Sequence, residues 1–192
     1  PMMEVLNANM DKIMTNNILE RENLSVKKYF VMSIHREENV DSEKNFSDLL
    51  ESIDEIVKIY KMPIIVSTHP RTKKKLKEIN YEKKNKFVRF SKPYGFHEFN
   101  NLQLNAFCVV SDSGTITEES SILNLPAITI RQAHERPEGM DEGTLVMTGL
   151  NKDRIIESIK VVTSQHKDER VTKIVKDYDV DNVSKKILRI IL

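Results

Sequence analysis

Three neighbouring stretches decide the fold: residues 29–34 read YFVMSI, residues 45–60 read NFSDLLESIDEIVKIY, and residues 63–68 read PIIVST. The first and third are short and almost wholly apolar, as is typical of strands that are buried on both faces. The middle stretch has helical spacing, with apolar residues at positions 46, 49, 50, 53, 56, 57 and 60. Together they predict a β-α-β unit with two parallel strands.

The same alternation continues along the chain. Further short apolar runs predict strands at 86–90, 106–110, 126–130 and 144–148. Helical patterns separate or follow them at 71–79, 96–105, 115–123, 151–163 and 180–191. We therefore predict an α/β fold, a doubly wound (Rossmann-like) parallel sheet of six strands with helices on both faces.

Composition narrows the class of protein. The 192 residues include 30 Lys and Arg against 29 Asp and Glu, so the charges nearly balance. The one basic cluster is RTKKKLKE at 71–78, and we expect it to be a solvated helix face rather than a nucleic-acid surface. Cys108 is the single cysteine, which excludes an internal disulfide and fits a reduced compartment. It lies in an apolar run, which favours a role in the core. With no signal segment and no apolar run of the roughly 18 residues that a membrane span needs, we expect a cytoplasmic protein without a membrane partner.

The ends of the chain differ from its centre. Residues 1–27 are polar, rich in Met and Asn, and helical in pattern, and the chain begins at Pro1 as if cut from something longer. We expect this segment to lead in from another domain. Residues 28–178 then form the Rossmann-like domain, and residues 179–192 form a C-terminal helix.

Polar clusters follow each of the first five predicted strands, where a doubly wound sheet binds its ligands. All five therefore fall on one rim of the sheet, and we expect a ligand site there. The clusters are SIHREEN (33–39), STHPR (67–71), SKPYGFHE (91–98), SDSGT (111–115) and RQAHERPEG (131–139).

The SDSGT cluster has the features of a phosphate seat. Gly114 lets the backbone approach a ligand, and the N–H groups from Ser113 to Ile116 would point outward at a helix start, where the helix dipole favours an anion. An ordinary helix N-terminus capped by Ser113 or Thr115 explains the same residues. The motif alone leaves both interpretations open.

Two charged residues near this seat favour a nucleotide. Glu119, one turn into the helix, has two acceptor oxygens that suit the vicinal hydroxyls of a ribose. Arg136 lies in a loop on the same rim and could clamp a diphosphate through two hydrogen bonds. The alternative for Arg136 is an ion pair with Glu135 or Glu138.

The histidines do not form a metal site. His35 and Arg36 stand at the first strand tip, where His35 is either near the ligand or an ordinary strand-end histidine. His35, His69, His97 and His134 come from separate loops without metal-ligand spacing. We expect no metal and no other cofactor.

The motifs HREEN (35–39), SDSGTITEES (111–120) and AHERPEG (133–139) together resemble the C-terminal nucleotide-binding domain of the non-hydrolysing UDP-N-acetylglucosamine 2-epimerases. The resemblance runs from about residue 28 to 163. It implies the C-terminal half of a GT-B type two-domain fold, a UDP-sugar substrate, a missing N-terminal domain of the same polypeptide, and a homodimer for the full-length enzyme.

Three longer matches are most similar to one branch of that family. HREENVD (35–41), ITEESS (116–121) and AHERPEGM (133–140) resemble the enzymes that act on UDP-2-acetamido-2,6-dideoxy-L-talose to make UDP-N-acetyl-L-fucosamine for capsule and O-antigen. The alternatives are a UDP-N-acetylglucosamine 2-epimerase that makes UDP-N-acetylmannosamine, a GT-B glycosyltransferase domain, and a non-catalytic nucleotide-binding module.

The resemblance also implies site residues. It places His35 near the sugar and Phe99 and Tyr94 near the uracil. Thr115 replaces a second glycine of the usual SDSGG, and Glu37 replaces a cation of the usual HRRE. The residues expected to bind UDP are Arg36, Tyr94, Phe99, Ser113, Gly114, Thr115, Glu119 and Arg136, with His35 and Arg136 catalytic.

The mechanism that the resemblance implies is elimination of UDP to a 2-acetamidoglycal, followed by re-addition with a proton delivered to C2 from the other face. Arg136 and the helix start at Gly114 would stabilise the charge that grows on the departing diphosphate. The carboxylates that move the C2 proton belong to the other domain in this family. The chain by itself is therefore expected to bind UDP weakly and to turn over nothing.

Overall fold

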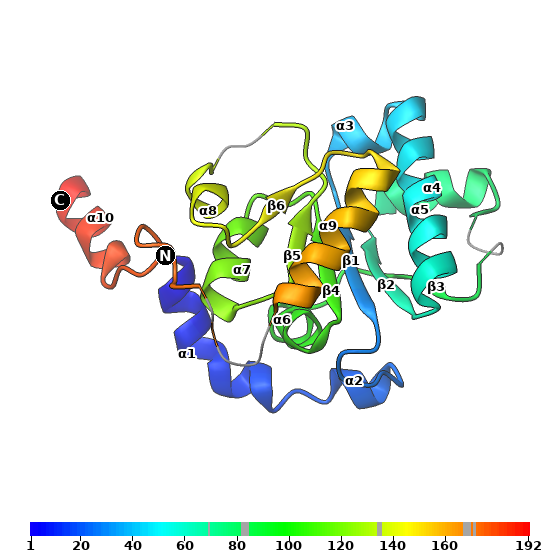
Figure 1. Cartoon of the computed structure of the whole chain (residues 1–192). Helices are drawn as coiled ribbons and strands as arrows, with labels where there is room; N and C mark the ends of the chain where they lie inside the picture. The colour runs from blue at the N-terminus through cyan, green and yellow to red at the C-terminus, as the bar shows by residue number, and fades with distance from the viewer. Residues whose placement is uncertain (69, 82–84, 134–135, 167–169, 171) are drawn as a thin grey trace.

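The structure is a computed structural model that describes residues 1–68, 70–81, 85–133, 136–166, 170 and 172–192. Helices and strands alternate along most of the chain (Figure 1). The strands are β1 (Phe30–Ile34), β2 (Ile64–Thr68), β3 (Val88–Ser91), β4 (Cys108–Ser111), β5 (Ala127–Thr129) and β6 (Val146–Met147). The helices are α1 (Met2–Met14), α2 (Ile18–Arg21), α3 (Glu37–Val40), α4 (Glu43–Tyr60), α5 (Pro70–Glu78), α6 (Phe96–Asn105), α7 (Ile116–Leu123), α8 (Glu138–Asp141), α9 (Lys152–Gln165) and α10 (Val183–Ile191).

The six strands form one parallel sheet in the order β3-β2-β1-β4-β5-β6. In the centre, Phe30 of β1 is paired with Ile64 of β2 on one side and with Cys108 of β4 on the other. The chain order reverses between β1 and β4, so the carboxyl ends of these two strands border the crevice where doubly wound sheets bind ligands.

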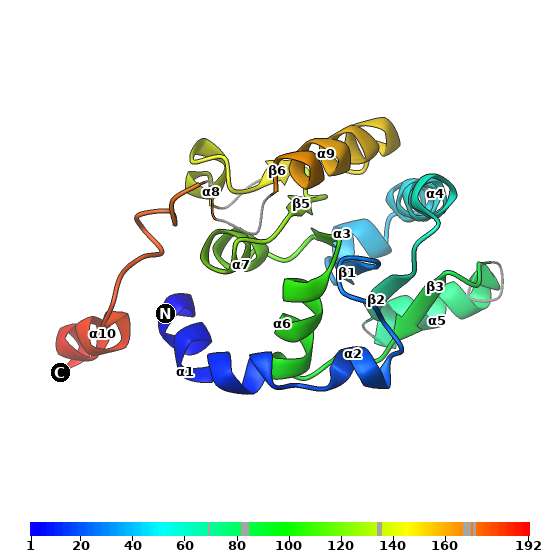
Figure 2. The ribbon, with the colours of Figure 1, turned by 60° about the horizontal axis from the view of Figure 1, so that its bottom comes forward.

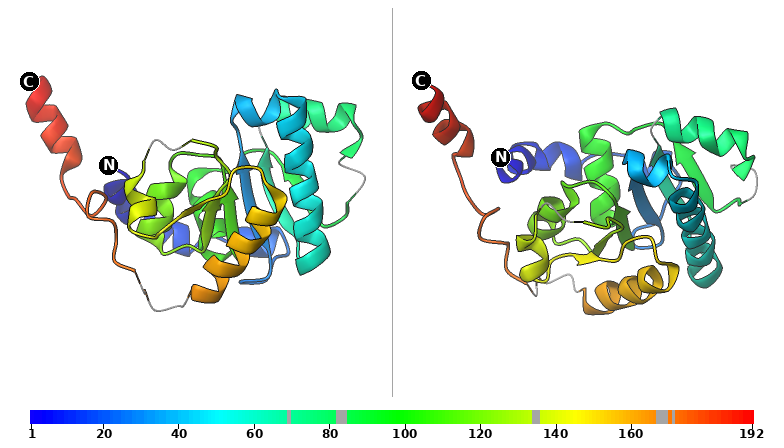
Figure 3. Two further views of the ribbon diagram at one scale, coloured as in Figure 1. Left: turned by 45° about the horizontal axis from the view of Figure 1, so that its top comes forward. Right: turned by 90° about the horizontal axis from the view of Figure 1, so that it is seen from above.

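Helices cover both faces of the sheet (Figures 2 and 3). One core cluster joins α4, α5 and α9 to one face, and a second joins α1, α6 and α7 to the other. Strand β1 contributes to both, because Phe30 and Met32 point into the first cluster and Val31 points into the second. The predicted doubly wound, six-stranded parallel sheet is therefore confirmed.

Two short helices lie where the sequence analysis expected only loops. Helix α3 begins at Glu37 directly after the β1 tip, and α8 begins at Glu138 within the RQAHERPEG cluster. Each has only four residues, which is about one helical turn and too short to show a helical period. Both helices lie on the rim that carries the polar clusters, so they help to shape the candidate site.

Two further features can be compared with the expectations from the sequence. Cys108 is fully buried in β4, as expected for a core residue. Helix α10 extends away from the rest of the chain and has no buried residue (Figure 3). Within the described residues, no helix combines the length and apolar character that crossing a membrane would require.

Candidate functional site

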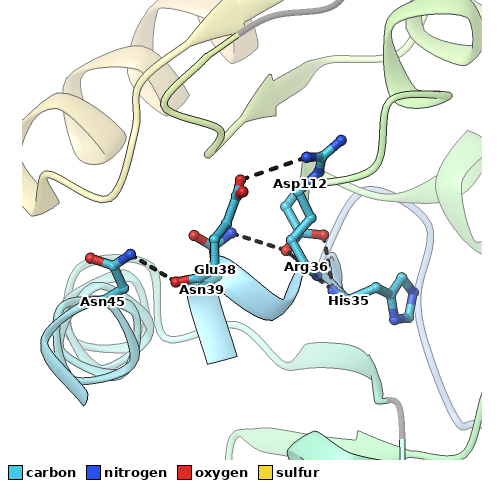
Figure 4. A network of polar contacts seen from close by, with 6 residues as sticks. All are labelled: His35, Arg36, Glu38, Asn39, Asn45 and Asp112. Carbon is cyan, nitrogen blue, oxygen red and sulfur yellow. Dashed lines mark hydrogen bonds and ion pairs between the residues drawn. The ribbon is translucent and has the colours of Figure 1, made fainter. Parts of the chain in front are cut away.

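Asp112 joins the tips of the two central strands. It follows β4 and is 0% exposed, and its carboxylate accepts hydrogen bonds from the backbone N–H of His35 at 2.9 Å and of Arg36 at 3.0 Å. Nδ2 of Asn39 donates to the same carboxylate at 3.0 Å (Figure 4). The backbone N–H of Asp112 in turn donates to the carbonyl of Ser33. This carboxylate therefore fixes the backbone from which His35 and Arg36 project.

The side chains at the β1 tip point outward. The imidazole of His35 is exposed and points away from Asp112 and Arg36 (Figure 4). Arg36 is half-buried, and its Nη1 lies 3.7 Å from a carboxylate oxygen of Glu38. The tip thus presents an imidazole to the rim from a rigid backbone. Asp112 was not among the predicted site residues, although its place in the SDSGT cluster after a buried strand was a signal for it.

The turn before α7 corrects one expectation about the phosphate seat. The N–H of Ser113 donates to Oγ of Ser111 at 3.0 Å, and the N–H of Thr115 is directed to Oγ of Ser113 at 3.3 Å. Oγ of Ser113 also lies 2.9 Å from Oγ1 of Thr115. Two of the N–H groups assigned to an anion are therefore engaged, because serine hydroxyls readily bond to nearby backbone groups. Ser113 and Thr115 are themselves half-exposed at the rim.

Two arginines converge on Gly114. A methyl group placed on this glycine would lie 2.8 Å from Nη1 of Arg136 and 3.3 Å from Nη1 of Arg131. The same groups line a cavity of about 20 Å³ together with Thr117, Thr129, Met140, Leu145 and Met147. The absence of a side chain at Gly114 is therefore what lets two guanidinium groups reach the start of α7. Arg136 was a predicted site residue and Arg131 was not, although Arg131 is the first residue of the RQAHERPEG cluster.

Arg136 pairs with a residue that the sequence did not suggest. Its Nη2 lies 3.3 Å from a carboxylate oxygen of Glu118, in the first turn of α7. Glu138, one of the two expected partners, instead accepts a hydrogen bond from the hydroxyl of Tyr178 at 2.8 Å, and Glu135 lies outside the described residues. Gly139 explains the placement, because a Cβ there would overlap Cγ2 of Thr117, so α8 packs closely on α7 and brings Arg136 with it.

Glu119 is placed on the inner side of α7. It is 9% exposed and accepts a hydrogen bond from Nε2 of Gln103 on α6 at 3.1 Å. Burial raises the pKa of the Glu119 carboxyl above its ordinary value, and the bond from Gln103 opposes part of that shift. The carboxylate that was expected to bind a ribose is thus held between two helices, and burial of its charge costs the folded state free energy.

Replacing Glu119 with glutamine is expected to change how stability depends on pH. Because the folded pKa is raised, the folded chain keeps a proton that the unfolded chain has released, and the free energy of unfolding falls as pH rises from about 4.5 through the folded pKa. Glu119→Gln cannot titrate and should lack this decrease, so the variant should gain stability over the wild type towards neutral pH. Urea denaturation at pH 4, 5.5 and 7 measures it.

The control for this experiment is Glu157→Gln, on the exposed side of α9. This change should leave the pH dependence as it is in the wild type. If the difference between wild type and Glu119→Gln does not vary with pH, then burial does not govern the protonation of Glu119.

The two aromatic residues expected near a base lie at the start of α6, with Tyr94 two residues before the helix and Phe99 within it. The hydroxyl of Tyr94 donates to Oγ of Ser91 at 2.8 Å, and both Tyr94 and Phe99 are half-buried against the second core cluster. His97, from the same segment, has its Nε2 2.9 Å from Oδ1 of Asn9 on α1 and so is engaged with the N-terminal helix. His69 and His134 lie outside the described residues.

Taken together, the parallel sheet, its reversal between β1 and β4, and the polar rim define a doubly wound α/β domain of the class that binds ligands at the carboxyl ends of its strands. Comparison with known protein families assigns this domain to one of them. The family described as UDP-N-acetylglucosamine 2-epimerase matches residues 1–192, and the chain belongs to this family.

Individual relatives agree with this assignment. A UDP-N-acetylglucosamine 2-epimerase of Methanocaldococcus jannaschii is 41% identical over 140 residues, which cover 71% of this chain and 38% of the relative. The solved structure of a Rickettsia bellii UDP-N-acetylglucosamine 2-epimerase has a TM-score of 0.89 at 45% identity, over 99% of this chain and 51% of the other. The Methanocaldococcus jannaschii enzyme in complex with UDP-GlcNAc and UDP has a TM-score of 0.86 at 35% identity, over 98% of this chain and 52% of the other.

The chain therefore spans about half the length, or less, of the relatives that it matches. This share is what the sequence analysis expected for one half of a GT-B type two-domain fold.

Proposed function

We propose that this chain is the nucleotide-binding domain of a UDP-N-acetylhexosamine 2-epimerase and that it holds UDP on the carboxyl rim of its sheet. The observation that carries the proposal is the approach of Arg136 to Gly114 at the start of α7, where a guanidinium and a helix N-terminus face the same space. A relative of 35% identity was solved with UDP-GlcNAc and UDP, which supports the ligand class. In our division of the chain, residues 28–178 form this domain, residues 1–27 lead in, and residues 179–192 follow.

The residue roles follow from the rim geometry. Ser113, Gly114 and Thr115 would face the diphosphate, with Arg36 approaching from the β1 tip. Arg136 would stabilise the negative charge that grows on the diphosphate as the anomeric C–O bond breaks. His35 projects from a backbone fixed by Asp112 and would act near the sugar. A second domain, which would correspond to the half of the relatives' chains that this chain does not cover, would supply the groups that move the C2 proton.

The nucleotide base and ribose would be held beside α6. Tyr94 and Phe99 are half-buried there and could flank a uracil. Glu119 faces α6 through Gln103, so a ribose hydroxyl would meet this carboxylate from the α6 side of α7. A ligand there would replace part of the hydration that burial removes from Glu119.

Two sugar substrates are candidates within this class. The matches at HREENVD, ITEESS and AHERPEGM favour UDP-2-acetamido-2,6-dideoxy-L-talose, which would connect the protein to capsule or O-antigen precursors. The named relatives favour UDP-N-acetylglucosamine and its conversion to UDP-N-acetylmannosamine. Incubating a full-length protein that contains this chain with each nucleotide sugar, and following epimerisation at C2 by NMR, separates the two.

The binding proposal is tested on the chain itself. We expect residues 1–192 to bind UDP several-fold more tightly than ADP, because the phosphate seat treats both alike and only the surroundings of Tyr94 and Phe99 can distinguish the bases. Titration calorimetry with UDP, ADP and uridine provides the comparison. Equal affinities for UDP and ADP would remove the uracil assignment, and no binding of either would remove the proposed site.

A further inference from the structure

Glu138 is a half-buried carboxylate two residues after Arg136, at the start of α8. The two side chains have opposite charges, and an ion pair between them would bring a second carboxylate to the guanidinium, which already lies 3.3 Å from Glu118. A guanidinium between two carboxylates has fewer of its N–H donors left for a ligand, and the three groups together have a net negative charge. The direction in which Glu138 points therefore matters to any anion that approaches Arg136.

Tyr178 decides that direction. Its hydroxyl donates a hydrogen bond to Oε1 of Glu138 at 2.8 Å, while Arg136 is paired with Glu118. All of these side chains line one cavity of about 350 Å³. Burial raises the pKa of the Tyr178 hydroxyl, and the bond to Glu138 raises it further, so the hydroxyl keeps its proton and remains a donor at neutral pH. The Glu138 carboxylate is thus held by an uncharged donor.

The segment that carries Tyr178 is fixed to α7. The terminal nitrogens of Arg170 donate to carbonyls in the last turn of α7, at 2.6 Å to Ser121 and at 2.7 Å to Ile122. The N–H of Val175 donates to Oγ of Ser121 at 2.9 Å, and Val175 is buried. The N–H of Tyr178 then donates to the carbonyl of Val175 at 2.9 Å. The hydroxyl of Tyr178 is therefore presented to α8 from a backbone that is tied to α7.

We propose that Tyr178 is a positioning residue for Arg136, because it holds the Glu138 carboxylate and so keeps Glu138 from competing with a bound anion for the guanidinium. Tyr178 has no direct contact with the ligand in this arrangement and acts through Glu138. The inference rests on the proposed UDP site and adds to that site a residue from a segment outside the rim.

The test is a double-mutant cycle on residues 1–192, with UDP titrated by calorimetry. Tyr178→Phe removes only the hydroxyl, so Glu138 is released towards Arg136 and UDP affinity should fall by about three- to fivefold, the scale of one partly exposed ion pair. In the Glu138→Gln background the same change should lower the affinity by less than about 1.5-fold, because no carboxylate is left to release. This rescue distinguishes the proposed role from a merely structural one.

Tyr81→Phe is the matched control. The Tyr81 hydroxyl also donates to a carboxylate at 2.8 Å, that of Asp54 on α4, and α4 lies at the other end of the molecule from α8 (Figure 1). Its loss should leave UDP affinity at the wild-type value.

Glu138→Gln by itself is a second test, and it also serves if Tyr178→Phe fails to fold. Because Tyr178 already holds the carboxylate, this change should alter UDP affinity by less than about twofold. A rise of about threefold or more would mean that Glu138 competes for Arg136 in spite of Tyr178, which would overturn the inference.

A further readout needs no ligand. The side-chain Nε–H signal of Arg136 in NMR spectra, assigned by its loss in Arg136→Lys, should shift in Tyr178→Phe and return towards its wild-type position in Tyr178→Phe/Glu138→Gln. Wild-type UDP affinity in Tyr178→Phe, or a loss that persists in the Glu138→Gln background, would overturn the inference, as would an Arg136 signal that does not move. A wild-type chain that binds no UDP overturns the proposed function instead, and the Arg136 signal then decides the inference alone.

Discussion

Replacing Arg136 with alanine is expected to lower the turnover of the full-length enzyme that we propose by about a hundredfold or more, the scale of removing one charge contact from a transition state. The guanidinium reaches Gly114 at the start of α7, where the diphosphate would leave the sugar. Negative charge grows on that group as the C–O bond breaks, so a cation there stabilises the transition state more than the bound substrate. Affinity for free UDP should also fall, because the same cation faces the product.

His35→Ala is the matched comparison. Its imidazole projects from the β1 tip rather than from the phosphate seat, so its loss should slow the reaction and leave the affinity for free UDP almost unchanged. The measurement pairs UDP affinity with the rate at which solvent deuterium enters C2 of the sugar. Wild-type exchange in both variants would exclude this rim from the chemistry and leave the domain as a nucleotide holder.

The second large effect is expected at Asp112. Asp112→Ala should lower the free energy of unfolding by about 3–5 kcal/mol, because it leaves the N–H groups of His35 and Arg36 and the amide of Asn39 without the buried carboxylate that accepts their hydrogen bonds. The segment after β1 would lose its side-chain link to Asp112, while the backbone bond from the N–H of Asp112 to the carbonyl of Ser33 would remain, and His35 would lose its fixed position. Urea denaturation followed by circular dichroism measures the change.

Two further variants make the Asp112 experiment specific. Asp112→Asn keeps one acceptor oxygen and turns an NH2 group towards donors, so its loss should be intermediate. Asp181→Ala removes an exposed carboxylate near α10 and should change stability by less than about 0.5 kcal/mol. If Asp112→Ala cost no more than this control, the carboxylate would not be what holds the two strand tips together.

Local pattern was sufficient for most of the fold. The apolar runs at 29–34 and 63–68 and the helical spacing at 45–60 correspond to β1, β2 and α4, because side-chain period is a property of consecutive residues. The same holds for α6, predicted and found at 96–105. Helices α3 and α8 escaped prediction because a single turn has no period to detect.

The candidate site could be predicted only in part from local sequence pattern. Gly114 and Arg136 could be singled out because each stands in a loop after a strand, and the topology of a parallel sheet brings such loops to one rim. Their contact, and the pairing of Arg136 with Glu118, could not be anticipated. The pairing depends on the close packing of α8 on α7 at Gly139, which no local pattern encodes.

By itself, then, the sequence determined the order of strands and helices, the parallel sheet, and the rim on which polar loops gather. Tertiary structure alone decided that Asp112 ties β1 to β4, that Arg131 lies buried beside Arg136, and that Glu119 faces Gln103. The physical reason is the distance along the chain over which each kind of interaction acts. Periodicity and helix or strand preference act between residues a few positions apart, whereas the partner of a buried charge is chosen by which elements pack together, often 70 or more positions away, as Asp112 and His35 are.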